Sequence, residues 1–144
     1  MTTGVIKDPY SSFNFLVEID GISRAAFREV SGLDSTIDVT EYREGGENTT
    51  PRKLAGMTKY SNIQLRWGMT DDMELYEWHR RAVRGELERK TGSIVLLDRR
   101  GEETARWNFV RAWPSKYTAP DFNAEGSEIA IESLELVHEG LERV

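Results

Sequence analysis

The two histidines are the side chains of this sequence best suited to proton transfer or to metal binding. The 144 residues include His79 and His138 and no cysteine. His79 lies in a segment with helical spacing, but no second histidine follows at the spacing that a helical metal motif such as HExxH requires. His138 lies near the C-terminus, and no motif supplies a nucleophile or an orienting group for it. We predict packing or interface roles for both histidines, with no metal site and no cofactor site.

Paired carboxylates are the second candidate for chemistry. They are Asp71/Asp72, Glu86/Glu88 and Glu102/Glu103. Glycosidases need two carboxylates that face each other across a cleft. These pairs instead lie at a predicted helix start and in turns, where acidic residues cap helices and keep surfaces soluble. No helix directly follows Gly45-Gly46, which argues against a phosphate-binding loop. We therefore predict no catalytic residues and no enzymatic activity.

Three tryptophans, Trp67, Trp107 and Trp113, could stack on bases or sugars in principle. Each lies in a segment of alternating polar and apolar residues, which favours packing in a core. A carbohydrate-binding sandwich would instead expose such aromatic rings on one face. That class of binding module stays open as an alternative.

Composition and charge narrow the class of protein further. The length fits one domain, residues 1–144, and the net charge of −6 argues against a general nucleic-acid binder. The sequence has no apolar run of about 18 residues, so we predict no membrane-spanning helix. The N-terminus lacks the apolar core of a signal peptide. Residues 79–100 carry seven basic and three acidic side chains, between two acidic flanks. This basic segment is either a solvated helix face or one half of a complementary contact.

Hydrophobic periodicity predicts about seven strands and one helix. The strands cover residues 12–19, 22–30, 35–43, 59–67, 94–97, 104–113 and 128–139. In the last strand the apolar positions change from odd to even numbers, which predicts a β-bulge near Glu132-Ser133. Without alternating strand and helix units, the fold class is mainly β: an antiparallel sandwich or barrel with one packed helix.

The predicted helix runs from Thr70 to Lys90, and its predicted apolar stripe is Met73, Tyr76, Val83 and Leu87. Gly85 falls inside it, where we expect close packing against the sheet. A glycine-rich stretch at about 44–57 has a single large aliphatic residue, Leu54, before Met57. Such a long stretch is either a functional loop or a hairpin extension that pairs with a neighbouring subunit.

Several long segments carry a family resemblance, in the right order and spacing. They are VSGLDSTIDVTEYREGG (30–46), RKLAGMTKYSNIQLRWG (52–68), LYEWHR (75–80), VLLDRRGEETARWNFVRAWPSKYTAPDFNA (95–124) and EIAIESLELVHEGLE (128–142). From about residue 10 to residue 142, the chain closely resembles the inner-tube proteins of contractile phage tails and phage-tail-like injection systems. That family is similar in fold to the haemolysin-coregulated tube protein of type VI secretion.

This resemblance implies a structural role. Such proteins form hexameric rings that stack into a hollow rigid tube, and a contractile sheath drives the tube through a target envelope. The implied fold is of the tail-tube type, with strands lining the lumen and the helix outside. The implied partners are further copies of the chain, the sheath protein, baseplate or hub and tube-initiator proteins, and a terminator or cap protein. The lumen of such a tube could hold DNA, a protein or no cargo at all, and the sequence leaves these three alternatives open.

The resemblance also implies where the protein acts and which residues join the subunits. Assembly is expected in the cytoplasm of the producing bacterium, followed by incorporation into a phage tail or an injection particle that passes transiently through a target membrane. The expected inter-subunit residues are Glu44, Gly45, Gly46, Glu47, Arg52, Lys53 and Leu54. A tube-initiator or baseplate protein of the same fold is the alternative function.

Overall fold

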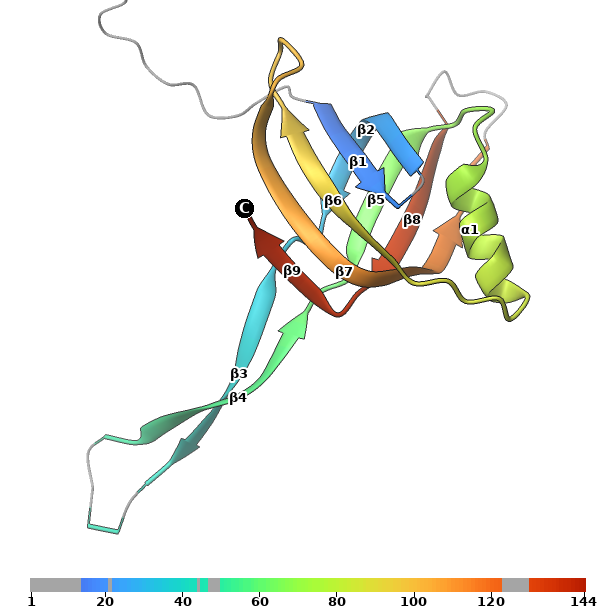
Figure 1. Cartoon of the computed structure of the whole chain (residues 1–144). Helices are drawn as coiled ribbons and strands as arrows, with labels where there is room; N and C mark the ends of the chain where they lie inside the picture. The colour runs from blue at the N-terminus through green and yellow to red at the C-terminus, as the bar shows by residue number, and fades with distance from the viewer. Residues whose placement is uncertain (1–13, 21, 44, 47–49, 123–129) are drawn as a thin grey trace, which may run out of the picture.

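A computed structural model describes residues 14–20, 22–43, 45–46, 50–122 and 130–144 of the chain. Its main element is a β-barrel from which a long two-stranded hairpin projects (Figure 1). The strands of the barrel are β1 (Asn14–Ile19), β2 (Ile22–Ser31), β5 (Ile63–Gly68), β6 (Lys90–Leu97), β7 (Glu103–Thr118), β8 (Ile131–Val137) and β9 (Gly140–Arg143). The hairpin consists of β3 (Ser35–Tyr42) and β4 (Arg52–Tyr60).

The barrel closes because β7 has neighbours on both sides. The sheet order is β6-β1-β2-β5-β8-β7-β9, and β6 also pairs with β7, all antiparallel. The 16 residues of β7 pair first with β9 and then with β8. Arg111 lies between these two stretches with a positive φ of 52°. The β6–β7 pairing closes the sheet, which is how barrels avoid open edges, and of the described barrel strands β9 alone has a single strand neighbour, β7.

Alternating side chains of the strands fill the barrel. In β5, Ile63, Leu65 and Trp67 are buried, while the residues between them are less buried. The core also contains Val17, Ile19, Phe27, Ile94, Phe109, Ala112, Leu134 and Leu136. Trp67 lies in this core and contacts Phe27 edge to face, with ring centroids 5.8 Å apart. Trp107 and Trp113 are half-buried. The prediction that tryptophans serve packing therefore holds most fully for Trp67.

The helix α1 (Glu74–Val83) is shorter than the sequence predicts. The carboxylate of Asp72 accepts the N–H of Glu74 at 3.0 Å, which marks its start. Gly85 lies beyond its end with φ of +90°, a left-handed conformation in which glycine costs little, and its N–H donates to the carbonyl of Ala82 at 3.0 Å. The predicted role of Gly85 inside the helix is therefore wrong.

The face of α1 that packs on the barrel also differs from the predicted stripe. Leu75 and Trp78 are the buried residues of the helix and belong to the barrel core. Met73, Val83 and Leu87 are exposed by 50%, 57% and 40%. Met73 and Leu87 lie outside the bounds of α1, whereas Tyr76, the fourth residue of the predicted stripe, is half-buried and packs against Tyr117 of β7.

The β-bulge predicted in the last strand is also wrong. Register between β5 and β8 runs without a shift from Ile63↔Leu136 to Gly68↔Ile131, so no bulge lies at Glu132-Ser133. The irregularity lies across the sheet in β7, between Pro114 and Lys116. Glu132 itself takes an inward position and is 7% exposed. The apolar phase seemed to change because a polar residue occupies one of the inward positions.

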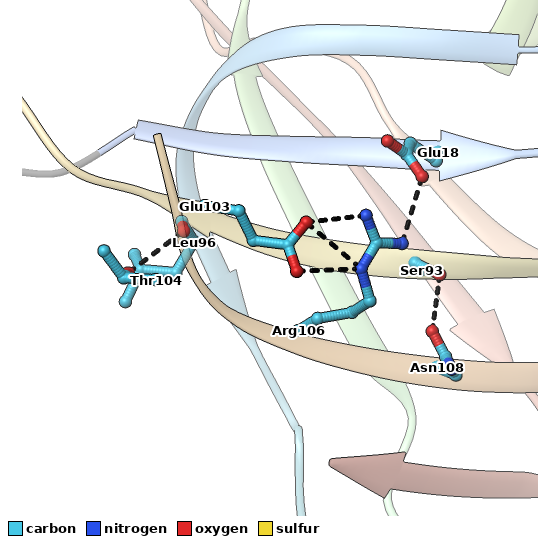
Figure 2. A network of polar contacts seen from close by, with 7 residues as sticks. All are labelled: Glu18, Ser93, Leu96, Glu103, Thr104, Arg106 and Asn108. Atoms are coloured by element: carbon cyan, nitrogen blue, oxygen red, sulfur yellow. Dashed lines mark hydrogen bonds and ion pairs between the residues drawn. The ribbon is translucent and has the colours of Figure 1, made fainter. Parts of the chain in front are cut away.

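A polar network covers the outward face of β1, β6 and β7 (Figure 2). Arg106 contacts Glu103 through Nη2 at 2.8 Å and Glu18 through Nη1 at 3.1 Å, which joins β7 to β1 across β6. Ser93 donates to Asn108 at 2.6 Å, and Thr104 donates to the carbonyl of Leu96 at 3.1 Å. These contacts tie neighbouring strands of the barrel wall together. No helix among the described residues is long and apolar enough to cross a membrane.

Candidate assembly surface

The β3–β4 hairpin exposes apolar side chains on both of its faces. Ile37 pairs with Thr58 and Val39 pairs with Ala55, so these two aliphatic residues share one face. Leu54 pairs with Thr40 on the other face. Ile37, Val39 and Leu54 are exposed by 54%, 62% and 50%. An isolated two-stranded hairpin is marginally stable in water, because it has no layer to bury its apolar side chains.

The root of the hairpin is fixed to the barrel. The hydroxyl of Ser61, just after β4, donates to the carboxylate of Asp34, just before β3. The ring of His138 lies 3.0 Å through Nε2 from the carbonyl of Ser61 and 3.1 Å through Nδ1 from the carbonyl of Gly140. His138 also contacts Tyr60, with ring centroids 5.5 Å apart. The hairpin therefore leaves the barrel from an anchored base (Figure 1).

The residues that the sequence assigned to subunit contact fall on the distal half of this hairpin. Gly45 and Gly46 lie in the turn that joins the strands, and Arg52, Lys53 and Leu54 are the first three residues of β4. Each of these three pairs with a residue of β3: Tyr42, Glu41 and Thr40. Glu44 and Glu47 lie outside the described residues. Residues 52–57 belong to β4, which pairs with β3 within the same chain.

Sequence reasoning missed the apolar residues nearer to the root. Ile37, Val39 and Met57 are exposed by more than 50%, and none was assigned to the assembly surface. Ile37 and Val39 already showed a period of two in the sequence. That signal was sufficient to place them on one face of a strand, but it could not show that no other layer of the chain covers that face.

The residues considered for chemistry have structural partners. The Nδ1 atom of His79 lies 3.0 Å from the carbonyl of Pro114 and helps to hold α1 against β7. The carboxylate of Asp72 accepts the backbone N–H of Glu74, the first residue of α1, and Glu103 binds Arg106. Within the described ranges, no group of three or more histidine or acidic side chains is placed to hold a metal ion.

Two side chains, Glu103 and Tyr117, have shifted pKa values. The hydrogen bond from Arg106 lowers the pKa of Glu103 below its ordinary value. Burial, and then the hydrogen bond to Glu132, raises the pKa of Tyr117 above its ordinary value. Both groups belong to the wall or the core of the barrel, and neither lies in a cleft beside a nucleophile. The shifts therefore bear on stability.

The sequence as a whole decides the family. Residues 11–142 match the family model described as T4-like virus tail tube protein gp19. The chain belongs to this tail tube family. No curated protein sequence matches it. The match spans both the barrel and the hairpin, so the described architecture is that of a tail tube protein.

Solved structures extend this finding. A chain of the extended PVC sheath-tube complex, an extracellular contractile injection system, is 30% identical with a TM-score of 0.84, over 96% of this chain and 93% of that chain. A chain of the anti-feeding prophage cap is 28% identical with a TM-score of 0.82, over 99% and 95%. Hcp1 from Flavobacterium johnsoniae, at 20% identity and a TM-score of 0.56 over 91% and 94%, shares the fold.

Proposed function

We propose that this tail tube protein is the structural subunit of an inner tube, in which six copies form a ring and the rings stack into a hollow rigid tube. The observation that carries this proposal is the hairpin with apolar side chains on both faces. A surface of that kind needs a partner on each side, because exposed apolar strands are otherwise a site of uncontrolled association. Identical neighbours in a closed ring supply such partners without open-ended growth.

The hairpin is the proposed contact between copies. Gly45, Gly46, Arg52, Lys53 and Leu54 contribute its distal half, and Glu44 and Glu47 complete the predicted set. Ile37 and Val39 extend the contact toward the root. Interfaces that must withstand mechanical force resemble obligate ones, which bury 2,000 Å² or more in total. A projecting ribbon with two usable faces adds area that the barrel alone would not offer.

The proposed partners follow from the relatives. Chains of the PVC sheath-tube complex, the PVC sheath/tube terminator, the anti-feeding prophage cap and the anti-feeding prophage baseplate resemble this chain. The proposed partners of this protein are a sheath protein that surrounds the tube, a baseplate at one end of the tube and a terminator or cap at the other end. Assembly takes place in the cytoplasm of the producing bacterium. The lumen carries cargo, and the tube acts without catalysis.

Assembly of hairpin variants tests this proposal. Ile37→Asp combined with Leu54→Asp places a carboxylate on each face and should abolish rings and tubes while the barrel stays folded. Ile37→Val combined with Leu54→Val is the matched control, because it keeps both positions apolar. Sedimentation and negative-stain electron microscopy measure assembly, and circular dichroism measures folding. Normal tubes from the double aspartate variant would contradict the proposed role of the hairpin.

A further inference from the structure

The outward face of α1 combines positive charge with a concave shape. Arg80, Arg81 and Arg84 line a hollow of about 370 Å³, together with Tyr76, Glu77 and Glu86. Three guanidinium groups therefore gather on one side of a single helix, in a chain whose net charge is −6. This surface differs in sign from the protein as a whole.

Two of these arginines have no acidic partner among the residues that the structure describes. Arg81 lies 3.6 Å from a carboxylate oxygen of Glu88. For Arg80 and Arg84, no carboxylate of the described residues lies within the 4.0 Å of an ion pair. Both side chains are exposed. Arg106, by contrast, forms ion pairs with both Glu103 and Glu18 on the barrel wall.

Two exposed aliphatic residues lie close in sequence to the arginines of this hollow. Val83 and Leu87 are exposed by 57% and 40% at the end of the helix. The platform beneath them is fixed, because Trp78 is fully buried and its indole N–H donates to the carbonyl of Glu88 at 2.8 Å. A rigid helix that presents unpaired arginines beside exposed aliphatic groups suits a partner segment with the opposite charge and a small apolar contact.

The position of α1 separates this surface from the hairpin. The helix lies beside the end of β7, whereas the hairpin projects from the opposite part of the barrel (Figure 1). The hairpin and the outward face of α1 are therefore separate surfaces of the molecule.

We propose that the arginine face of α1, formed by Arg80, Arg81 and Arg84, docks an acidic segment of the sheath protein. This inference rests on the proposed tube function. Contacts between copies in a tube are permanent, and permanent interfaces are rich in apolar area. A sheath must instead release the tube when it contracts. Exposed charge pairs suit that task, because each is weak and salt screens it.

A charge-reversal pair tests the docking surface. Arg80→Glu with Arg84→Glu is compared with Arg99→Glu and Arg100→Glu, two exposed arginines in the turn between β6 and β7. Both pairs change the net charge equally. Tubes of each variant are mixed with the sheath protein of the same particle and sedimented over a range of salt concentrations. The α1 variant should bind sheath at least about tenfold more weakly, while the turn variant binds as the unaltered tube does.

The outcomes separate this inference from the tube function. Equal sheath binding by the two variants would overturn the docking surface. Failure of the α1 variant alone to form tubes would also overturn it, because the arginines would then lie between copies. A lack of tubes from the unaltered protein, even with baseplate and sheath co-expressed, would contradict the proposed function itself.

Discussion

The hydroxyl of Tyr117 donates a hydrogen bond of 2.6 Å to the carboxylate of Glu132 inside the barrel. Tyr117 belongs to β7 and Glu132 to β8, and Glu132 is 7% exposed. The ring of Tyr117 also contacts Tyr76 of α1 edge to face, with centroids 4.9 Å apart. Tyr117 thus forms a hydrogen bond with a buried carboxylate and also packs against the helix.

Removal of this hydroxyl should destabilise the fold. Tyr117→Phe leaves the buried carboxylate without its donor, and we expect the free energy of unfolding to fall by about 1–3 kcal/mol. Tyr76→Phe is the matched control, because it preserves the ring contact and should change stability by less than about 0.5 kcal/mol. Denaturant unfolding of unassembled protein measures both. An equal loss in the two variants would show that the hydrogen bond contributes little.

Tyr117 should also make stability depend on alkaline pH. Its pKa is raised by burial and by the bond to Glu132, so the folded protein keeps a proton that the unfolded chain loses above the ordinary tyrosine pKa of about 10. Its contribution is complete below that pH and is lost as pH rises toward the folded pKa. Unfolding measured across alkaline pH should show a steeper loss for the unaltered protein than for Tyr117→Phe. Parallel curves would contradict this assignment.

Glu103 should have the opposite effect at acidic pH. The hydrogen bond from Arg106 lowers its pKa, so its contribution is present above the ordinary glutamate pKa of about 4.3 and is lost as pH falls through the lowered value. Glu103→Gln should flatten the acid limb of the stability curve. Glu102→Gln, at the neighbouring exposed position, should leave the limb unchanged. The prediction fails if the two variants behave alike.

Gly92 occupies a position where a side chain has no room. A Cβ at this residue would lie 2.3 Å from the carbonyl oxygen of Glu18 and 2.7 Å from Cζ of Phe109. Gly92→Ala should therefore displace β1 or the buried Phe109 ring and cost about 1–3 kcal/mol or more. Gly45→Ala is the control, because nothing lies within 4 Å of the added atom. Thermal unfolding compares the two, and a stable Gly92→Ala protein would show that the strands can separate locally.

The sequence predicts the parts of the fold that bury alternate residues. The alternation in β5 marks Ile63, Leu65 and Trp67 as one face, and the structure buries all three. All of β4 except Lys59 and Tyr60 was missed, because exposure on both faces removes the polar and apolar alternation on which strand prediction depends. The inward position of Glu132 was missed for another reason. Its burial depends on a hydrogen bond from Tyr117, which lies on a neighbouring strand. The local periodicity of one strand carries no information about such a partner.

The assembly surface was predicted only in its distal half. The glycines and charged residues of 44–54 led to the prediction of an inter-subunit contact there, whereas Ile37 and Val39 were predicted only as residues of a strand. Whether an aliphatic strand residue is buried depends on which layer lies over it, and for these two no described part of the chain does so.

Cryo-electron microscopy of the assembled tube tests the central claim most directly. We expect six copies in each ring, with Ile37, Val39 and Leu54 of every hairpin covered by neighbouring copies. A complete tube in which the hairpins project freely into solvent, or whose rings contain another number of copies, would contradict it.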